Sequence, residues 1–156
     1  MQIKDKYYFA ADVHLGLPVN NAEQREQRFV AWLNMAAQDA KAIFLLGDIF
    51  DFWCEYKKVV PKGFIRTLGK LAELADIGIE IHFLPGNHDL WTFGYISDEL
   101  GIQVHHRPLE VNLNGEIFYL AHGDNVGKMP KGYRHLRSIF TSCFFQKCFA
   151  SIHPRW

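Results

Sequence analysis

Short apolar runs alternate with amphipathic stretches over the first half of the chain. Three such runs predict buried strands, at Tyr7–Ala11, Ala42–Leu46 and Ile79–Leu84. Between them, apolar residues three and four positions apart mark one helix face over residues 22–37 and another between Pro61 and Gly78. Asn20 or Asn21 is the expected N-cap of the first helix. Because strand, helix and strand alternate, the pattern predicts parallel βαβ crossovers and an α/β fold.

The second half of the chain has a different pattern. Residues 102–104 are expected to add a short edge strand. Asn114-Gly115 separates the apolar segments 109–113 and 117–121, which predicts a type I′ hairpin. From Arg134 to Ile152, apolar residues recur at steps of three and four and include several phenylalanines, which predicts a helix with a wide aromatic face. No run approaches the roughly 20 apolar residues that a membrane-spanning helix needs.

Composition narrows the class of protein. A chain of 156 residues with 49% hydrophobic content is long and apolar enough for one domain with a real core. Lys plus Arg equals Asp plus Glu, at 17 each, so nothing in the overall charge favours nucleic acid as a partner. The 3 cysteines have no framework spacing and no secretory signal is evident, which indicates a reduced, cytosolic protein.

Four groups of polar residues stand at the ends of predicted strands. Asp12-Val13-His14 follows the first strand, Gly47-Asp48 the second, Gly86-Asn87-His88-Asp89 the third, and His122-Gly123-Asp124 the second arm of the hairpin. In an open α/β sheet, ligands bind at the carboxyl ends of the strands. Each group alone is more often a turn or an incidental triplet. Four in order are hard to attribute to chance, so we expect them to form one site.

The donor types in these groups suit a pair of metal ions. Carboxylate, imidazole and amide oxygen together suit Mn, Fe or Zn, and two such ions can split a phosphate ester. The expected ligands are Asp12 and His14 for one ion, Asn87 and His122 for the other, and Asp48. Two neighbouring divalent ions repel each other strongly unless an anion bridges them. Asp48 is the expected bridge, because it lies between two other ligand sets in the sequence.

Other polar residues stand next to these ligands. We expect His88 to contact the phosphate or to protonate the leaving oxygen. Asp51 is expected to orient His88 through its other ring nitrogen, and Asp89 is a second supporting carboxylate. For Asp124, capping of a loop is favoured over a ligand role. The remaining histidines are expected to be ordinary packed or surface residues: His82, His105, His106, His135 and His153.

The order of the motifs resembles the calcineurin-like metallophosphoesterase superfamily, in which D-x-H, G-D-x-x-D, G-N-H-D, H and G-H-x-H follow one another. The first four elements match the groups above, over nearly the whole chain. The resemblance implies an αββα sandwich with a dinuclear site between the sheet ends. No Gly-His-x-His follows His122, so we expect an N-terminal part of that sandwich, with an open site that holds metal weakly and leaves the activity of this chain alone in question. Residues 1–127 would be the core and 128–156 the start of a helical lid.

Longer segments resemble one family within the superfamily, the UDP-2,3-diacylglucosamine pyrophosphohydrolases. These segments are Asp12–Gly16, Leu46–Trp53 and Leu120–Asp124. The resemblance implies a Mn-dependent hydrolase that splits the pyrophosphate bond of UDP-2,3-diacylglucosamine into lipid X and UMP in lipid A biosynthesis. Such an enzyme would act in the cytoplasm, at the inner face of the inner membrane. The best-known members carry Arg where His88 stands, which brings the catalytic detail closer to generic phosphoesterases.

In that family a helical insertion follows His-Gly-Asp and covers the acyl chains, and the aromatic helix sits where it would begin. The implied substrate-binding residues are Arg134, Arg137, Phe140 and Phe144. An equal alternative is that this helix packs into another part of the fold. Two functional alternatives stay open: another phosphodiesterase or phosphatase of the superfamily, and a non-catalytic binding module. Exposed sheet edges and apolar faces also predict self-association.

Overall fold

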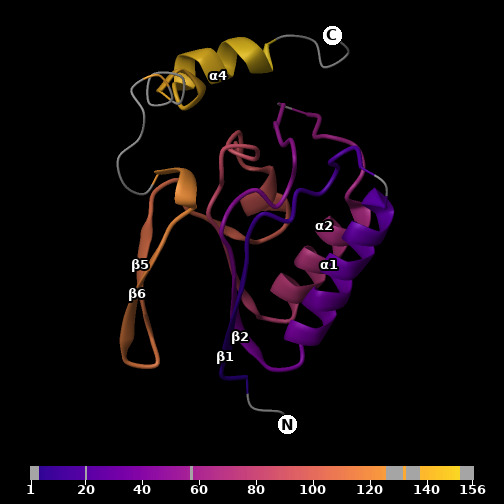
Figure 1. The fold of residues 1–156 in the computed structure, drawn as a ribbon, viewed down its shortest axis with the longest axis vertical. Helices are drawn as coiled ribbons and strands as arrows, with labels where there is room; N and C mark the ends of the chain where they lie inside the picture. The colour runs from indigo at the N-terminus through magenta and orange to yellow at the C-terminus, as the bar shows by residue number, and fades with distance from the viewer. Residues whose placement is uncertain (1–3, 20, 57, 126–131, 133–137, 152–156) are drawn as a thin grey trace.

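The computed structural model describes residues 4–19, 21–56, 58–125, 132 and 138–151. The larger elements in chain order are β1 (Lys6–Ala10), α1 (Ala22–Ala36), β2 (Ala40–Leu45), α2 (Ile65–Asp76), β3 (Glu80–Phe83), β4 (Gln103–Val104), β5 (Leu109–Leu113), β6 (Glu116–Leu120) and α4 (Cys143–Ala150). A π-helical turn at Tyr95–Glu99 and a 3₁₀ turn at Gly123–Asn125 complete them. Figure 1 shows their arrangement.

A four-stranded parallel sheet in the order β1-β2-β3-β4 forms the centre of the fold. Its register pairs Phe9 with Phe44, Phe44 with His82, and Phe83 with Val104. The predicted α/β fold is therefore confirmed, and each predicted strand of the sheet overlaps an observed one. Because all these strands are parallel, their carboxyl ends lie at one edge of the sheet, and the polar groups follow them there.

Helices α1 and α2 cover one face of this sheet (Figure 1). Alternate residues of a strand point to opposite faces, so Ile43 and Leu45 face the helices while Ala42 and Phe44 face away. The helices bury one stripe each against the sheet, formed by Phe29, Leu33, Ala36, Leu68, Leu71 and Leu74. The two faces of β2 thus belong to two separate apolar clusters.

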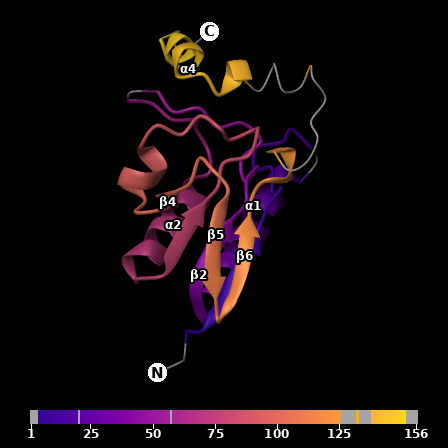
Figure 2. The same cartoon turned by 90° about the vertical axis from the view of Figure 1, so that its left-hand side faces the viewer.

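The antiparallel hairpin β5–β6 lies on the other face of the sheet, as Figures 1 and 2 show from two sides. Leu113 and Leu120 of the hairpin pack against Phe44 and Leu84. Asn114 and Gly115 have φ values of 55° and 94°, as a type I′ turn requires. The predicted hairpin is confirmed, and the fold has three layers: helices, parallel sheet and hairpin.

Helix capping follows the prediction in position but not in hydrogen bonding. Asn21 is the N-cap of α1, as predicted, but it lies in the left-handed region at φ 78° and its side chain makes no capping hydrogen bond. Asn20 lies outside the described residues. Helix α2 begins at Ile65, later than predicted, because Phe64 adopts a φ of 57° and packs against Phe50 instead of continuing the helical stripe. Glu26 of α1 accepts hydrogen bonds from the Thr67 N–H and hydroxyl, which gives the first turn of α2 an acceptor from another helix.

The C-terminal aromatic region is not one continuous helix. Residues 138–140 are helical, residues 141 and 142 interrupt the helix, and α4 follows at Cys143–Ala150. Residues 134–137 and 152 of the predicted helix, and the predicted boundary at residue 127, lie outside the described residues. Helix α4 lies above the carboxyl ends of the parallel strands (Figures 1 and 2). Over the part of the chain that the structure describes, no helix is long and apolar enough to cross a membrane.

Candidate metal centre

The loops that follow β1, β2 and β3 are joined to one another beyond the ends of the strands. The N–H of His14 donates to the carbonyl of Asp48 at 2.9 Å, and that of Asp51 to the carbonyl of Leu15 at 2.9 Å. The N–H of Trp53 donates to the carbonyl of His88 at 3.1 Å. These bonds fix the three polar loops relative to one another, so the side chains at their tips meet in a defined geometry.

Two groups of side chains are close enough to hold a metal ion each, and they share one residue. Asp12, Asp48 and His122 form one group, and His14, Asp48 and His88 form the other; within each, the ligand atoms lie within 4.8 Å of one another. Asp12 is thus grouped with His122, whereas the sequence predicted that it would share an ion with His14. The Asp48 Oδ2 atom is 3.4 Å from His122 Nε2 and 3.9 Å from His14 Nε2. The bridging position predicted for Asp48 is therefore consistent with its place between both groups.

Each of the three histidines is held at Nδ1 by an oxygen. His122 Nδ1 lies 2.9 Å from the Leu46 carbonyl, His14 Nδ1 lies 3.2 Å from Asp51 Oδ1, and His88 Nδ1 lies 2.7 Å from the Asp51 carbonyl. A bond of this kind selects the tautomer with the proton on Nδ1 and leaves Nε2 as a metal ligand or phosphate contact. The Asp51 carboxylate thus orients His14. Asp51 contacts the other ring nitrogen of His88 as predicted, but through its backbone carbonyl rather than its side chain.

Two glycines make this geometry sterically feasible. A Cβ atom on Gly86 would lie 2.2 Å from Asp48 Oδ1, and one on Gly47 would lie 2.5 Å from His122 Nδ1. Gly47 also has a φ of 88°, which side-chain-bearing residues rarely adopt. The close approach of the two loops therefore requires glycine at positions 47 and 86. The glycines of these two motifs serve packing, whereas the polar residues next to them serve chemistry.

Backbone strain gathers at the same place. Asp12, His14 and Asp48 have φ values of 53°, 48° and 52°, although none of them is a glycine. A non-glycine residue in the left-handed region costs about 1–2 kcal/mol. Such strain persists where the surroundings impose it, and it clusters at functional sites. Three strained residues among the expected ligands support a functional role for the whole group.

Asp89 connects the second and third loops from beneath the ligands. It is fully buried and accepts hydrogen bonds from the N–H groups of Gly86, Asp48, Ile49 and Phe50 at 2.7–3.3 Å. Burial raises the pKa of Asp89 to about 6, against the opposing effect of these backbone donors. Asp89 is thus a supporting carboxylate, but it supports the backbone of the two loops rather than the side chain of a ligand.

The sequence reasoning missed Glu55. Its buried carboxylate accepts hydrogen bonds from Trp53 Nε1 at 3.0 Å, from the Tyr95 N–H at 3.0 Å and from the Phe93 N–H. Glu55 thereby joins the loop after β2 to the start of the π-helical turn. An acid next to a cysteine in the segment Trp53–Tyr56 gave no periodic or motif signal that could have found it.

A small cleft of about 210 Å³ adjoins the second ligand group. It is lined by Asp51, Phe52, Trp53, Asn87, His88, Leu90, Trp91 and Phe140. Trp91 Nε1 donates to the Phe140 carbonyl at 2.9 Å, and the Trp91 ring meets that of Phe149 edge-on at 4.5 Å. Of the predicted substrate-binding residues, Phe140 therefore lines the cleft, whereas Phe144 does not and is 69% exposed. Arg134 and Arg137 lie outside the described residues.

Two ligand groups that share a carboxylate, at the strand ends of an α/β sheet, are the arrangement of a dinuclear metal site. The chain matches the calcineurin-like phosphoesterase family over residues 6–150, and it belongs to that family. The predicted superfamily is therefore confirmed.

Relatives in this family carry a more specific name. A UDP-2,3-diacylglucosamine hydrolase of Porphyromonas gingivalis is 45% identical over 157 residues, which cover 99% of this chain and 60% of the relative. Proteins of the same name from Nitrosococcus oceani and Ectopseudomonas mendocina are 27% and 33% identical over 96% and 70% of this chain, and over 58% and 45% of their own lengths. The chain thus spans about three fifths, or less, of the length of the curated relatives it matches.

Proposed function

We propose that this chain carries most of the metal site of an enzyme that hydrolyses the pyrophosphate bond of UDP-2,3-diacylglucosamine, giving lipid X and UMP in lipid A biosynthesis. The observation that carries the proposal is the position of Asp48 between the two ligand groups. These groups adjoin the 210 Å³ cleft lined by Trp53, Trp91 and Phe140, which we call the aromatic cleft. The names of the relatives supply the substrate, and the family supplies the reaction class.

The residues present fit a pair of divalent ions. Asp12 and His122 would hold one ion, His14 would hold the other, and Asp48 would bridge them. Asn87 lines the adjoining cleft next to His88, and we propose that it adds a neutral oxygen. This mixture of oxygen and imidazole donors suits Mn, with Fe and Zn as alternatives. When bound, the ions supply the positive charge and Lewis acidity that phosphate ester hydrolysis requires.

His88 is the residue that we assign to the substrate. Its side chain is 41% exposed, it lines the aromatic cleft, and its Nδ1 is held by the Asp51 carbonyl. We propose that its Nε2 contacts the phosphate or protonates the leaving oxygen. Its place beside His14 and Asp48 also lets it act as a ligand. A His88→Gln variant that loses turnover but keeps its full metal content would separate the substrate role from the ligand role.

The aromatic cleft is the proposed position of the lipid part of the substrate. Phe52, Phe140 and Phe145 are 55%, 45% and 50% exposed near or on the C-terminal helical segments. Exposing several aromatic side chains to water is energetically unfavourable, and such a surface suits acyl chains or the edge of a bilayer. We therefore propose that the protein works in the cytoplasm at the inner face of the inner membrane, where such a substrate is found.

The hairpin supports the predicted self-association. Ile117 and Tyr119 of β6 alternate along the strand and are 70% and 65% exposed, so one face of the hairpin presents apolar side chains to solvent. We propose that copies of this chain associate through that face. Sedimentation velocity would show dimers or larger species, and a monomer at all concentrations would reject this contact.

Turnover of the lipid substrate tests the proposed function. The protein at its natural full length, loaded with Mn, is incubated with UDP-2,3-diacylglucosamine, and UMP and lipid X are quantified by mass spectrometry. Equal release of both products, lost in Asp48→Asn, is the expected result. Hydrolysis of a simple aryl phosphodiester without release of UMP would favour another phosphodiesterase of the family. Failure with both substrates in a metal-loaded protein would favour the binding module.

A further inference from the structure

A second cleft opens beside the metal centre, on the side of α1. It has a volume of about 500 Å³ and is lined by Asp12, Val13, Asn21, Arg25, Arg28 and Phe29. Small-molecule sites commonly have volumes of about 300–1,000 Å³. Asp12 belongs both to this cleft and to the first ligand group, so the cleft leads directly to the metal centre. It shares no lining residue with the aromatic cleft beside His88.

Two arginines give this cleft a positive charge. Arg25 and Arg28 are three positions apart on α1 and therefore lie on the same side of the helix. Arg25 Nη1 donates to the carbonyl of Val13 at 3.2 Å, which fixes the guanidinium group next to the Asp12 loop and leaves its other donors available. Arg28 is exposed and has no hydrogen bond or ion pair with any residue that the structure describes.

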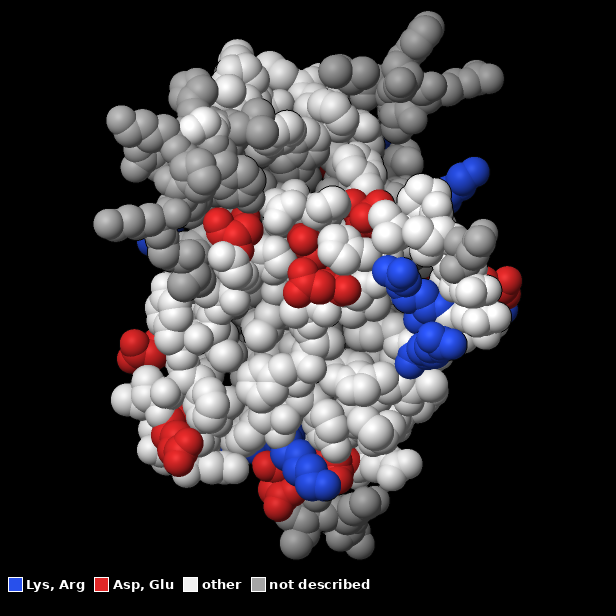
Figure 3. Space-filling model, in the orientation of Figure 1, with Lys and Arg blue, Asp and Glu red and all other residues white. Residues whose placement is uncertain are grey.

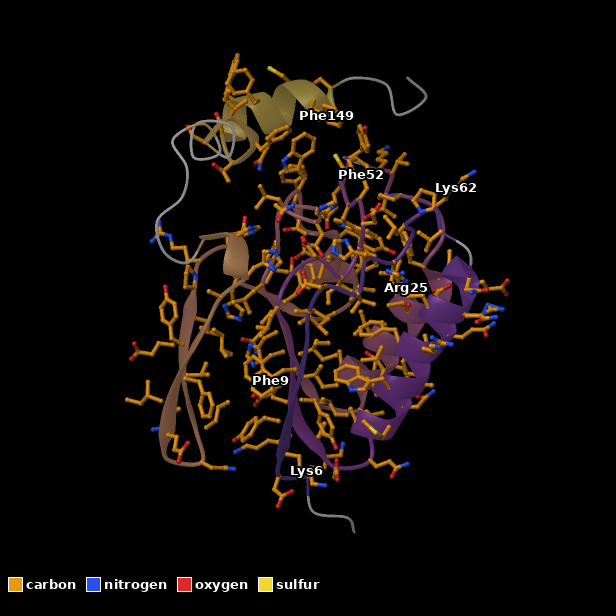
Figure 4. All side chains as sticks on the ribbon, viewed as in Figure 1. Lys6, Phe9, Arg25, Phe52, Lys62 and Phe149 are labelled. Carbon is orange, nitrogen blue, oxygen red and sulfur yellow. The ribbon has the colours of Figure 1, made fainter. Side chains whose placement is uncertain are left out.

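The nearby acids do not need these arginines as counter-ions once metal is bound. Asp12 and Asp48 would face divalent cations, and Glu26 on α1 is engaged with Thr67. In Figure 3, acidic side chains gather near the middle of the visible face and basic side chains lie next to them. Figure 4 places Arg25 at the α1 edge of that face, whereas Phe52 and Phe149 lie toward α4. Cationic and aromatic surfaces thus adjoin the metal centre in different directions.

We propose that the Arg25–Arg28 cleft binds the nucleoside monophosphate half of the substrate, while the aromatic cleft takes the acylated sugar. This inference rests on the proposed function, since it divides that substrate between two clefts. Guanidinium groups recognise phosphate oxygens through charge-assisted hydrogen bonds, and the amide of Asn21 can add a contact to the ribose or the base. The phosphorus at the metal centre would then join two chemically unlike halves.

Product inhibition of the full-length, Mn-loaded enzyme tests the proposal, with UMP and lipid X as separate inhibitors. Arg28→Ala should raise the inhibition constant of UMP by roughly 10-fold, as expected for the loss of a charge-assisted contact. The inhibition constant of lipid X should change less than about twofold. Arg28→Lys should recover part of the UMP affinity, because lysine restores the positive charge but not the paired N–H donors of the guanidinium group. Arg107→Ala, which removes an exposed arginine outside both clefts, is the matched control.

The outcomes separate this inference from the proposed function. If the wild-type enzyme turns over the lipid substrate but Arg28→Ala leaves inhibition by UMP as in Arg107→Ala, the cleft is rejected and the function stands. If inhibition by UMP and lipid X weakens equally, the arginines act on the metal centre as a whole, and the division of the substrate is wrong. If the wild-type enzyme releases no UMP, the proposed function fails and the nucleotide cleft fails with it.

Discussion

The metal centre and the C-terminal helix lie close together, but they are held by very different means. Around Asp48 the loops share backbone hydrogen bonds, a buried carboxylate and glycines that no larger residue could replace. Helix α4 is connected to the body through Trp91, which contacts Phe140 and Phe149. Most of its described aromatic side chains face solvent.

This difference means that the geometry of the metal centre and the position of α4 depend on different kinds of contact. The ligands come from short segments that each follow a strand, so motifs reveal them, and many hydrogen bonds between the loops then fix their geometry. Among the residues that the structure describes, α4 meets the other elements through the contacts of Trp91, over long sequence distances, and packing of this kind leaves room for movement. We therefore expect the metal centre to be rigid and the aromatic region to adapt to its occupant.

The largest effect should come from removing the shared ligand. Asp48→Asn retains the shape of the side chain but loses the negative charge between the two ligand groups. We expect turnover to fall by at least about 100- to 1,000-fold, since the loss of a preorganised charge-stabilising group has effects of this size. Steady-state kinetics measures the loss, and circular dichroism verifies the fold. Turnover within tenfold of wild type would refute the bridging role.

Removing the buried carboxylate beneath the site should affect stability next most strongly. Asp89→Ala leaves buried backbone N–H groups of Gly86, Ile49 and Phe50 without their acceptor. Each such group costs about 1–3 kcal/mol, so the free energy of unfolding should fall by about 3 kcal/mol or more. Urea denaturation measures it, with the exposed Asp76→Ala as the control. Equal stability of the two variants would show that the loops hold together without Asp89.

A smaller effect is expected where α4 meets the body. Trp91→Phe keeps an aromatic ring but removes the Nε1 donor to the Phe140 carbonyl. A hydrogen bond of this kind contributes about 0.5–1.5 kcal/mol, so KM for the acylated substrate should rise roughly 2- to 10-fold. Hydrolysis of a small phosphodiester should not change. Trp32→Phe, on α1 beside Tyr8 and outside both clefts, is the control. A parallel loss with both substrates would place the effect at the metal centre instead.

The smallest effect should be a pH dependence at the outer edge of the parallel sheet. His82 and His105 lie 3.0 Å apart between ring nitrogens. Burial, and then the charge of His105, lowers the pKa of His82, with Glu80 opposing; burial and then His106 lower the pKa of His105. A lowered histidine pKa means that the folded state resists protonation. This contribution to stability is present above about pH 6.5, the usual histidine value, and is lost as the pH falls below it.

Thermal unfolding at pH 7.5 and pH 5.5 tests this pair. The wild-type protein should lose more stability at the lower pH than His82→Gln, which cannot be protonated. His106→Gln keeps both rings of the pair but removes a charge that lowers the pKa of His105, so its loss of stability should lie between those of wild type and His82→Gln. If wild type and His82→Gln lost the same stability between the two pH values, the pair would not be the source of the dependence.

Sequence alone predicted the parallel sheet, the hairpin and the gathering of the polar groups at the strand ends, because each depends on local periodicity or on a short motif. It failed where distant residues decide the outcome. The start of α2 depends on Phe64 packing against Phe50, and its first turn finds an acceptor in Glu26 of another helix. The role of Glu55 and the break in the aromatic helix depend equally on partners that no periodic pattern reveals.

The most direct test of the two-ion centre is electron paramagnetic resonance during a Mn titration. The wild-type protein at its natural full length should bind two ions that give a spin-coupled signal, because one carboxylate would join them. His122→Ala should retain one ion with an uncoupled signal, since only the group around His14 remains complete. Two uncoupled ions in the wild-type protein, or a coupled pair that survives in Asp48→Asn, would contradict a centre bridged by Asp48.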